Sequence, residues 1–191
     1  MAEILEFRWH GRGGQGTVTA AKVFAEAALA EDKYIQAFPE YGPERAGAPL
    51  AAYNRVSDEP IYIHCAVKNP HYVAVVDATL LTSGVDVKKG AHEDATYLVN
   101  TTKPAAEVRE TIGLSGGKVF TIDATGISRE ELDRPLPNTP MLGAIAKISG
   151  RISLQTLRDA IKLRLGKKFS DKIITANIKM AERGFEEVKG E

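Results

Sequence analysis

Apolar and polar positions follow one another along the chain in a pattern that predicts strands and helices in turn. Segments with a period of two, or with continuous β-branched residues, indicate strands, and apolar residues three or four positions apart indicate helices. Strands are therefore expected over residues 3–9, 33–38, 50–57, 61–64, 72–78, 95–100 and 118–124. Helices are expected over residues 17–30 and 104–113. We expect Pro39 to end the second strand, and residues 57–60 to form the turn between the third and the fourth.

From Asn138 onward the pattern becomes purely helical. The predicted helices cover residues 138–150, 153–166 and 170–188. Asn138 or Thr139 is the expected N-cap of the first of them, and Ser153 of the second. Strands that alternate with helices are typical of an α/β fold. We therefore expect one Rossmann-like three-layer domain over residues 1–191, with a mostly parallel, mixed sheet and added C-terminal helices.

Composition narrows the possible classes of function. The 191 residues include 25 basic and 25 acidic side chains, so the formal net charge is zero, whereas a general nucleic-acid binder carries a basic excess. The chain has no apolar run long enough for a signal peptide or for a membrane span, which needs about 18 apolar residues. We expect a cytoplasmic protein that binds neither nucleic acid nor a membrane.

Cys65 is the only cysteine of the chain. One thiol cannot form an intrachain disulfide, and it cannot supply the cysteine set of an iron–sulfur cluster or a structural zinc site. Its apolar surroundings predict a small side chain buried on a strand. A nucleophilic role would need a base, and the adjacent His64 would point to the opposite face of such a strand.

A glycine-rich loop stands between the first predicted strand and the first predicted helix. Gly11, Gly13, Gly14 and Gly16 fill four of six positions, and Thr17 begins the helix. Bare backbone lets a ligand approach closely, and a helix N-terminus favours negative charge. The backbone amides, the Gln15 amide, the Thr17 hydroxyl and Arg12 together suit a diphosphate that is held without being hydrolysed.

Three other interpretations of this loop stay open. The spacing Gly11-x-Gly13-x-x-Gly16 matches the dinucleotide fingerprint, but that site needs an acidic residue at the end of the second strand, and the first carboxylate there is Glu40, beyond Pro39. A phosphate-binding loop of the Walker type would need a lysine where Thr17 stands. A tight turn without any ligand remains possible, although four glycines are more than a turn requires.

A second loop, "FPEYGPERAGAPL" over residues 38–50, combines three prolines that restrict the backbone with two glycines that allow sharp reversals. Tyr41, Glu44 and Arg45 are the polar side chains on this frame. Because the loop follows the second strand, we expect it on the same rim of the sheet as the glycine loop. A plain surface connection is the alternative.

Together, "GRGGQGT" and "FPEYGPERAGAPL" resemble the gamma subunit of the 2-oxoacid:ferredoxin oxidoreductases, and "PNTPMLGAIAKISG" is similar to that family's third signature. The resemblance covers about residues 7–185 and is closest to the pyruvate branch, with the 2-oxoisovalerate branch next. It implies an enzyme that decarboxylates a 2-oxoacid, reduces ferredoxin and transfers the acyl group to coenzyme A. Thiamine diphosphate, magnesium and iron–sulfur clusters are then expected in partner alpha, beta and delta subunits, and this chain alone is expected to be inactive.

The resemblance also implies which residues meet coenzyme A. They are the loop residues Gly11, Gly13, Gly14, Gln15, Gly16 and Thr17, together with Arg45, Asn138 and Asn177. Neither a catalytic nor a metal-binding residue is expected, and His10 is interpreted as a strand-end residue. Asn138 could instead cap its helix, and Asn177 could bond to a neighbouring subunit. The alternatives in function are a stand-alone dinucleotide-binding or regulatory module, and the same family acting on 2-oxoisovalerate or aryl pyruvates.

Overall fold

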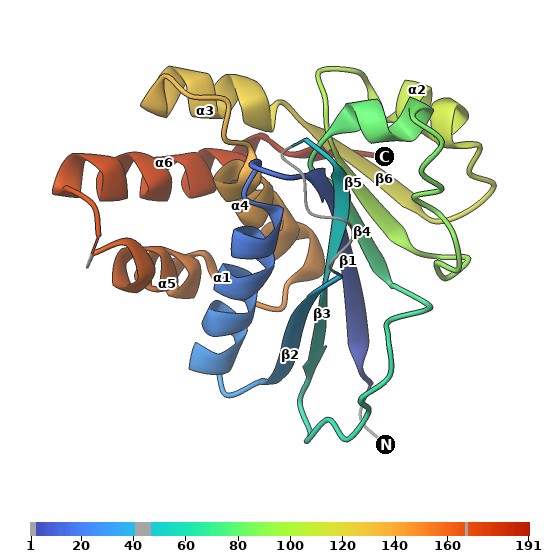
Figure 1. The fold of residues 1–191 in the computed structure, drawn as a ribbon, viewed down its shortest axis with the longest axis horizontal. Coiled ribbons are helices and arrows are strands. Elements are labelled where there is room, and N and C mark those ends of the chain that lie inside the picture. Colours follow the sequence, from blue (N-terminus) through green and yellow to red (C-terminus); the bar gives the residue numbers. More distant parts are fainter. Residues whose placement is uncertain (1–2, 41–46, 167) are drawn as a thin grey trace.

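The computed structural model describes residues 3–40, 47–166 and 168–191, and in that part of the chain a twisted sheet forms the middle layer (Figure 1). The strands follow the order β2-β3-β1-β4-β5-β6-β7 across the sheet. Their bounds are β1 Leu5–Arg12, β2 Tyr34–Glu40, β3 Pro49–Ser57, β4 Tyr72–Val75, β5 Thr96–Asn100, β6 Lys118–Ile122 and β7 Lys189–Gly190.

The sheet is mixed. β1, β4, β5 and β6 pair in parallel, whereas β3 runs antiparallel to both β1 and β2, and β7 runs antiparallel to β6. Five strands therefore point one way and two the other. This arrangement confirms the expected α/β class with a mostly parallel, mixed sheet.

Helices cover both faces of this sheet, unequally (Figure 1). One face carries α1 Thr17–Ala30, α4 Asn138–Ser149, α5 Leu154–Leu165 and α6 Asp171–Glu187, with α3 Ala124–Leu132 packed on α4 and α6. The opposite face carries α2 Ala105–Ile112 and the short helix η1 Ala78–Thr82. The result is the three-layer arrangement that the sequence predicts, with the C-terminal helices gathered on the α1 side.

The core on the α1 side is built around aromatic side chains of β1. Phe7 and Trp9 of β1 and Phe24 of α1 are almost fully buried. The centroid of the Phe24 ring lies 4.8 Å from that of Phe7 and 6.2 Å from that of Trp9. The Trp9 indole N–H donates to Asn54 of β3 at 2.8 Å, and the Asn54 amide donates to the Ala21 carbonyl of α1 at 2.9 Å. A buried polar pair that is fully bonded in this way fixes α1 against β1 and β3.

Several predicted strand boundaries are wrong. β1 continues to Arg12, β4 ends at Val75, and Ala124 belongs to α3 and not to β6. β2 continues through Pro39 to Glu40, because an edge strand tolerates a missing N–H on its outer side. Residues 61–64 do not form a strand, although their pattern resembles one. Since β3 already pairs with β1 on one side and with β2 on the other, no edge of β3 is left for this segment.

The helix termini give a mixed outcome. Helix α1 has the bounds that the sequence predicts, and Ser153 caps α5 by accepting a hydrogen bond from the Thr156 amide. The expected cap of α4 by Asn138 or Thr139 is wrong: Pro137 takes the cap position, and no side chain bonds there. Helix α3 was not predicted, although Asp123 marks its start by accepting from the Gly126 amide at 2.7 Å.

Candidate functional site

The glycine loop joins the carboxyl end of β1 to the N-terminus of α1. Gly14 and Gly16 have φ angles of 96° and 76°, a region that favours glycine. Within the described part of the chain, the backbone amides of Thr17, Val18 and Thr19 have no hydrogen-bond partner, whereas Ala20 already bonds to the Gly16 carbonyl. Such a row of free donors, at the positive end of the helix dipole, is suited to an anion.

Gly11 and Thr17 close the inner side of this loop. A Cβ at Gly11 would lie 2.0 Å from the Thr17 hydroxyl, so only glycine allows this approach. Thr17 is 1% exposed, and among the described residues its hydroxyl has no hydrogen-bond partner. The Thr17 hydroxyl therefore faces the protein interior.

Asn138, the first residue of α4, lies directly against the loop. A Cβ at Gly16 would approach the side-chain Cγ of Asn138 to 2.8 Å and its amide nitrogen to 2.9 Å. Asn138 is half-buried, and its side-chain amide bonds to no group within residues 3–40, 47–166 and 168–191. The structure thus brings together Gly16 and Asn138, which are 122 positions apart, and leaves the amide available.

A polar network holds the other side of the loop. The Gln15 side chain accepts from the Arg12 amide at 2.8 Å and donates to Asp77 at 2.6 Å. Arg12 forms an ion pair with Asp77 at 3.3 Å, and its guanidinium also donates to the Thr79 hydroxyl at 3.1 Å. Both ends of the Gln15 amide are therefore engaged within the protein, so Gln15 shapes the loop.

Asp77 is the centre of this network. It follows β4, the parallel neighbour of β1, so the carboxyl ends of the two strands bring it to the loop. Burial opposes ionisation of its carboxyl, but hydrogen bonds from Thr79 and Gln15, together with the Arg12 charge, outweigh burial and lower its pKa. From the sequence, Asp77 stands out only as a residue near the end of the strand expected over residues 72–78. Its position after an apolar strand next to β1 was the signal that could have identified it.

The second loop reaches the glycine loop, as expected from its place after β2. The Gly13 amide donates to the Ala48 carbonyl at 3.0 Å, and the Gly47 amide donates to the Gly13 carbonyl at 3.2 Å. Arg12 adds a hydrogen bond to the Gly47 carbonyl at 3.1 Å. Arg45, with Tyr41 and Glu44, lies outside the described residues.

Asn177 lies on α6 and is engaged within the helical layer. Its side-chain oxygen accepts from the Thr139 hydroxyl at 3.0 Å, and its nitrogen donates to the Ile173 carbonyl at 2.8 Å. Thr139 is the neighbour of Asn138, so Asn177 ties α6 to the start of α4. The structure places Asn177 next to the site through this contact, and no bond joins it directly to the described part of the glycine loop.

The dinucleotide interpretation required an acidic residue at the end of the second strand. Glu40 does end β2, but β3 stands between β2 and β1, so Glu40 is not on the strand next to the glycine loop. The Glu40 carboxylate accepts from the Tyr53 hydroxyl instead. Its position on a remote strand explains why a ribose held at the loop would not meet this carboxylate.

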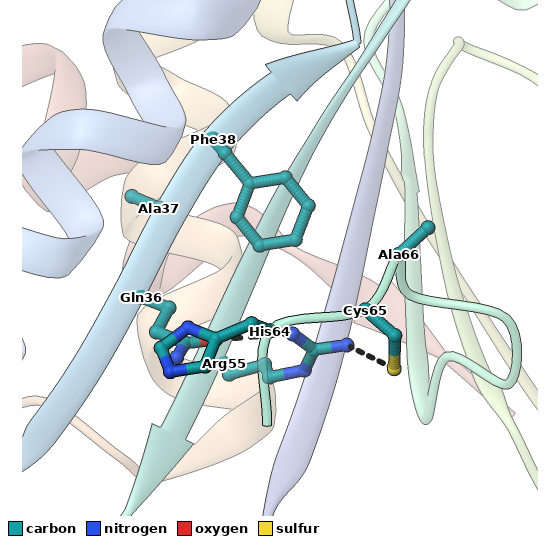
Figure 2. A pocket seen from close by; sticks show the side chains of 7 residues that line it. All are labelled: Gln36, Ala37, Phe38, Arg55, His64, Cys65 and Ala66. Carbon is teal, nitrogen blue, oxygen red and sulfur yellow. Dashed lines mark hydrogen bonds between the residues drawn. The ribbon is translucent and has the colours of Figure 1, made fainter. Parts of the chain in front are cut away.

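Cys65 is exposed and lies outside the strands, so the prediction of a buried strand residue is wrong. It borders a cavity of about 560 Å³ that it shares with Gln36, Phe38, Arg55 and His64 (Figure 2). The buried guanidinium of Arg55 donates to the Cys65 thiol at 3.9 Å and forms an ion pair with Glu6 at 2.8 Å. Figure 2 shows the cysteine on the loop that crosses over the guanidinium.

The described residues contain neither a candidate metal site nor a helix suited to span a membrane. Within residues 3–40, 47–166 and 168–191, no three His, Cys, Asp or Glu side chains gather as a metal site would require. None of the helices in the part of the chain that the structure describes has the length and apolar character needed to cross a membrane.

The chain is similar to proteins of one family over nearly its whole length. The family described as pyruvate ferredoxin/flavodoxin oxidoreductase matches residues 6–187. Pyruvate synthase subunit PorC of Thermotoga maritima is 48% identical over 187 residues, which are 98% of this chain and 96% of that protein. A common subunit gamma of the pyruvate/ketoisovalerate oxidoreductases of Thermococcus kodakarensis is 44% identical over 182 residues, 95% of this chain and 96% of that protein.

Solved structures show the same fold. The crystal structure of pyruvate oxidoreductase subunit PORC from Thermotoga maritima matches with a TM-score of 0.87, at 44% identity and over 98% of both chains. The 2-oxoglutarate:ferredoxin oxidoreductase of Magnetococcus marinus, with 2-oxoglutarate, coenzyme A and succinyl-CoA bound, matches with a TM-score of 0.75 at 19% identity. That match covers 95% of this chain and 30% of the other, and at this identity it shows the fold alone.

Proposed function

The chain belongs to the pyruvate ferredoxin/flavodoxin oxidoreductase family, and on that premise we propose that its glycine loop holds coenzyme A for an enzyme that oxidises pyruvate with ferredoxin as electron acceptor. Membership confirms the resemblance to the gamma subunit, so the chain is one subunit of an oxidoreductase. The pyruvate substrate and the contact with coenzyme A are the parts that we propose.

The free amides at the start of α1 carry this proposal. Coenzyme A has a diphosphate and a 3′-phosphate, and the amides of Thr17, Val18 and Thr19 are donors that no group in the described chain uses. The unpaired side-chain amide of Asn138 adds a fourth donor beside Gly16. Exposed Gly14 lets a ligand reach the backbone without meeting a side chain. These groups fit an anionic nucleotide and offer no carboxylate to grip a ribose.

The remaining chemistry belongs to partners in this proposal. A single cysteine cannot ligate an iron–sulfur cluster, so electron transfer to ferredoxin must run through other subunits. We assign thiamine diphosphate, magnesium and the clusters to alpha, beta and delta subunits. The chain itself, one domain in the cytoplasm, would bind coenzyme A and help to join those subunits. Without them it would have no activity.

Replacing Asn138 in the assembled enzyme tests the proposal. Asn138→Ala removes the free amide without touching α1, so the KM for coenzyme A should rise by about tenfold, the effect of one hydrogen bond to a charged group, while the KM for pyruvate stays unchanged. Gln155→Ala is the matched control, because Gln155 is an exposed residue of α5 and the change removes a side-chain amide away from the loop. An unchanged KM for coenzyme A in Asn138→Ala and in a Gly16→Ala enzyme would overturn the proposal.

A second substrate is supported by one observation. The relative in Thermococcus kodakarensis is named as common to pyruvate and ketoisovalerate oxidoreductases. We propose as the alternative that this chain also serves an enzyme acting on 2-oxoisovalerate. Purification of the chain with its partners, followed by turnover assays on both 2-oxoacids, separates the two cases: one set of partners and one substrate contradicts the alternative.

A further inference from the structure

The face of the sheet opposite α1 is divided into an apolar part and a polar part. Over β4, β5 and β6 it is covered by apolar side chains that pack beneath η1 and α2. Over β1 and β3 this face carries five polar side chains: Glu6, Arg8 and His10 from β1, and Tyr53 and Arg55 from β3. Charged groups on an inner sheet strand are costly unless they are paired, so the polar part calls for an explanation.

A cavity of about 800 Å³ lies over this polar part of the sheet. Arg8, His10 and Tyr53 form its floor, and residues from the segments 67–69 and 85–90 form its opposite side. Its apolar wall consists of Pro49, Leu50, Ala51, Val67, Leu80 and Val85. Charged side chains of both signs also line the cavity, namely Lys68 and Lys89 and the carboxylates Glu40 and Asp86. No residue of the glycine loop borders this space, so the proposed coenzyme A contact does not account for it.

Arg8 is a buried cation whose charge has no acidic partner in close contact. It is 7% exposed, and its guanidinium donates to the carbonyls of Val87 at 2.7 Å and Lys89 at 2.8 Å. In the described part of the chain no carboxylate lies within ion-pair distance of Arg8, and its Nε has no hydrogen-bond partner. A buried charge normally has an ionic partner, and one N–H of Arg8 is still free to bind one.

His10 stands beside Arg8 on the same strand and the same face. It is 8% exposed, and its Nε2 likewise has no partner among the described residues. Burial, and next the Arg8 charge, lower the pKa of His10 to about 4, while Asp86 acts weakly in the other direction. At neutral pH the imidazole is therefore uncharged, and its Nε2–H tautomer can donate a hydrogen bond to an anion.

We infer that this cavity binds a small monocarboxylate with a short aliphatic body. The carboxylate would accept from the free N–H of Arg8 and from His10, and the aliphatic part would lie on the wall formed by Leu50, Val67 and Leu80. Arg8, Lys68 and Lys89 outnumber Glu40 and Asp86 in the lining, so its charges favour an anion over a cation. Because the Arg8 guanidinium already donates to the carbonyls of Val87 and Lys89, it has one N–H left beside His10, and these two donors match the two oxygens of one carboxylate.

Titration of the full ¹⁵N-labelled chain with sodium butyrate, followed by NMR, tests this inference. The Arg8 Nε–H signal and the backbone amides around the cavity should shift and saturate with butyrate. 1-Butanol and n-butylammonium, which have the same aliphatic body, should produce no saturable shift at equal concentration. The absence of saturation with butyrate, or an equal response to 1-butanol, would overturn the inference.

Two variants make the assignment specific. Ala51→Met fills the cavity from β3 without removing a bond of Arg8, so the affinity for butyrate should fall at least about tenfold. Ala106→Met, on an exposed position of α2, is the control and should leave the affinity unchanged. Arg8→Met should abolish binding, and if it does not fold, Ala51→Met still decides the matter. Butyrate binding that persists unaltered in Ala51→Met would place the ligand elsewhere and contradict the inference. Failure of coenzyme A binding would not affect this test.

Discussion

The side-chain amide of Asn138 lies against Gly16, so that a Cβ on Gly16 would come within 2.8 Å of the Asn138 Cγ. This contact joins the start of α4 to the start of α1 at the carboxyl ends of the parallel strands. Among the described residues, it brings two distant sequence motifs together with donors left over.

Gly16→Ala should displace the Asn138 amide. Alanine at a φ of 76° costs about 1–2 kcal/mol of unfolding free energy, and the new methyl group pushes Asn138 away from the loop. Gly14→Ala is the matched control, because Gly14 has a φ of 96° but open space around a Cβ. Chemical denaturation should give similar losses for both variants. Coenzyme A affinity should fall further in Gly16→Ala, and equal affinities would contradict a role for Asn138.

Thr17→Val should stabilise the chain by about 1 kcal/mol. The Thr17 hydroxyl is buried against Gly11 without a partner among the described residues, and an unsatisfied hydroxyl costs about 1–3 kcal/mol. Urea denaturation measures the gain. Because the backbone amide of Thr17 survives the change, we expect coenzyme A affinity to stay within about twofold. A tenfold loss would instead identify the hydroxyl as a ligand contact.

Asp77→Asn should weaken the network that holds the glycine loop. The change weakens the charge-assisted hydrogen bonds from Thr79 and Gln15 and the ion pair with Arg12. We expect the unfolding free energy to fall by about 1–2 kcal/mol, closer to the lower value because solvent reaches the carboxylate. Because folding lowers the pKa of Asp77, its contribution is complete above the ordinary value of 3.8 and is lost as pH falls through the lower folded value. Unfolding free energies of the two proteins should therefore converge in acid. A constant difference down to about pH 2 would contradict this assignment.

His10 should make the chain less stable in mild acid. Its folded pKa of about 4 lies below the ordinary 6.5, so between these values the unfolded chain takes up a proton that the folded chain does not. The unfolding free energy should therefore fall as pH drops through this window, by up to about 3 kcal/mol. His71, whose pKa burial and then His92 also lower, contributes in the same direction. The difference between the wild-type chain and His10→Gln isolates His10, and parallel pH profiles would contradict its burial as a neutral group.

The sequence predicts most of the helices and strands because apolar spacing and capping residues act within a few neighbouring positions. Helix α1 follows from apolar spacing alone, and Ser153 is recognisable as a cap because capping depends on neighbouring residues. Residues 61–64 were misread because a strand also needs another strand to pair with, and pairing is not local information. Pro39 was predicted to end β2 and does not, because proline ends a central strand but is tolerated in an edge strand.

The candidate site was predicted in part. The glycine loop and Asn138 were named from the sequence, and the structure places them in contact. What the sequence did not indicate is how the side chains are used: Gln15 is turned to Asp77, the Thr17 hydroxyl faces inward, and Asn177 bonds to Thr139. The cavity at Arg8 and His10 was missed as well, because two polar residues on an alternating strand are typical of a solvated face.

The two ends of the sheet carry a consequence for the chain before it meets any partner. At one margin, Pro39 interrupts the row of outward N–H groups of β2, so an incoming strand from another molecule cannot form a continuous ladder there. At the other margin, β7 spans two residues, and the Arg109–Glu191 ion pair fastens the terminus beside it. Both features oppose fibrillar self-association through the edges of the sheet. Such protection is useful to a newly synthesised polypeptide that has not yet joined the other subunits of its enzyme.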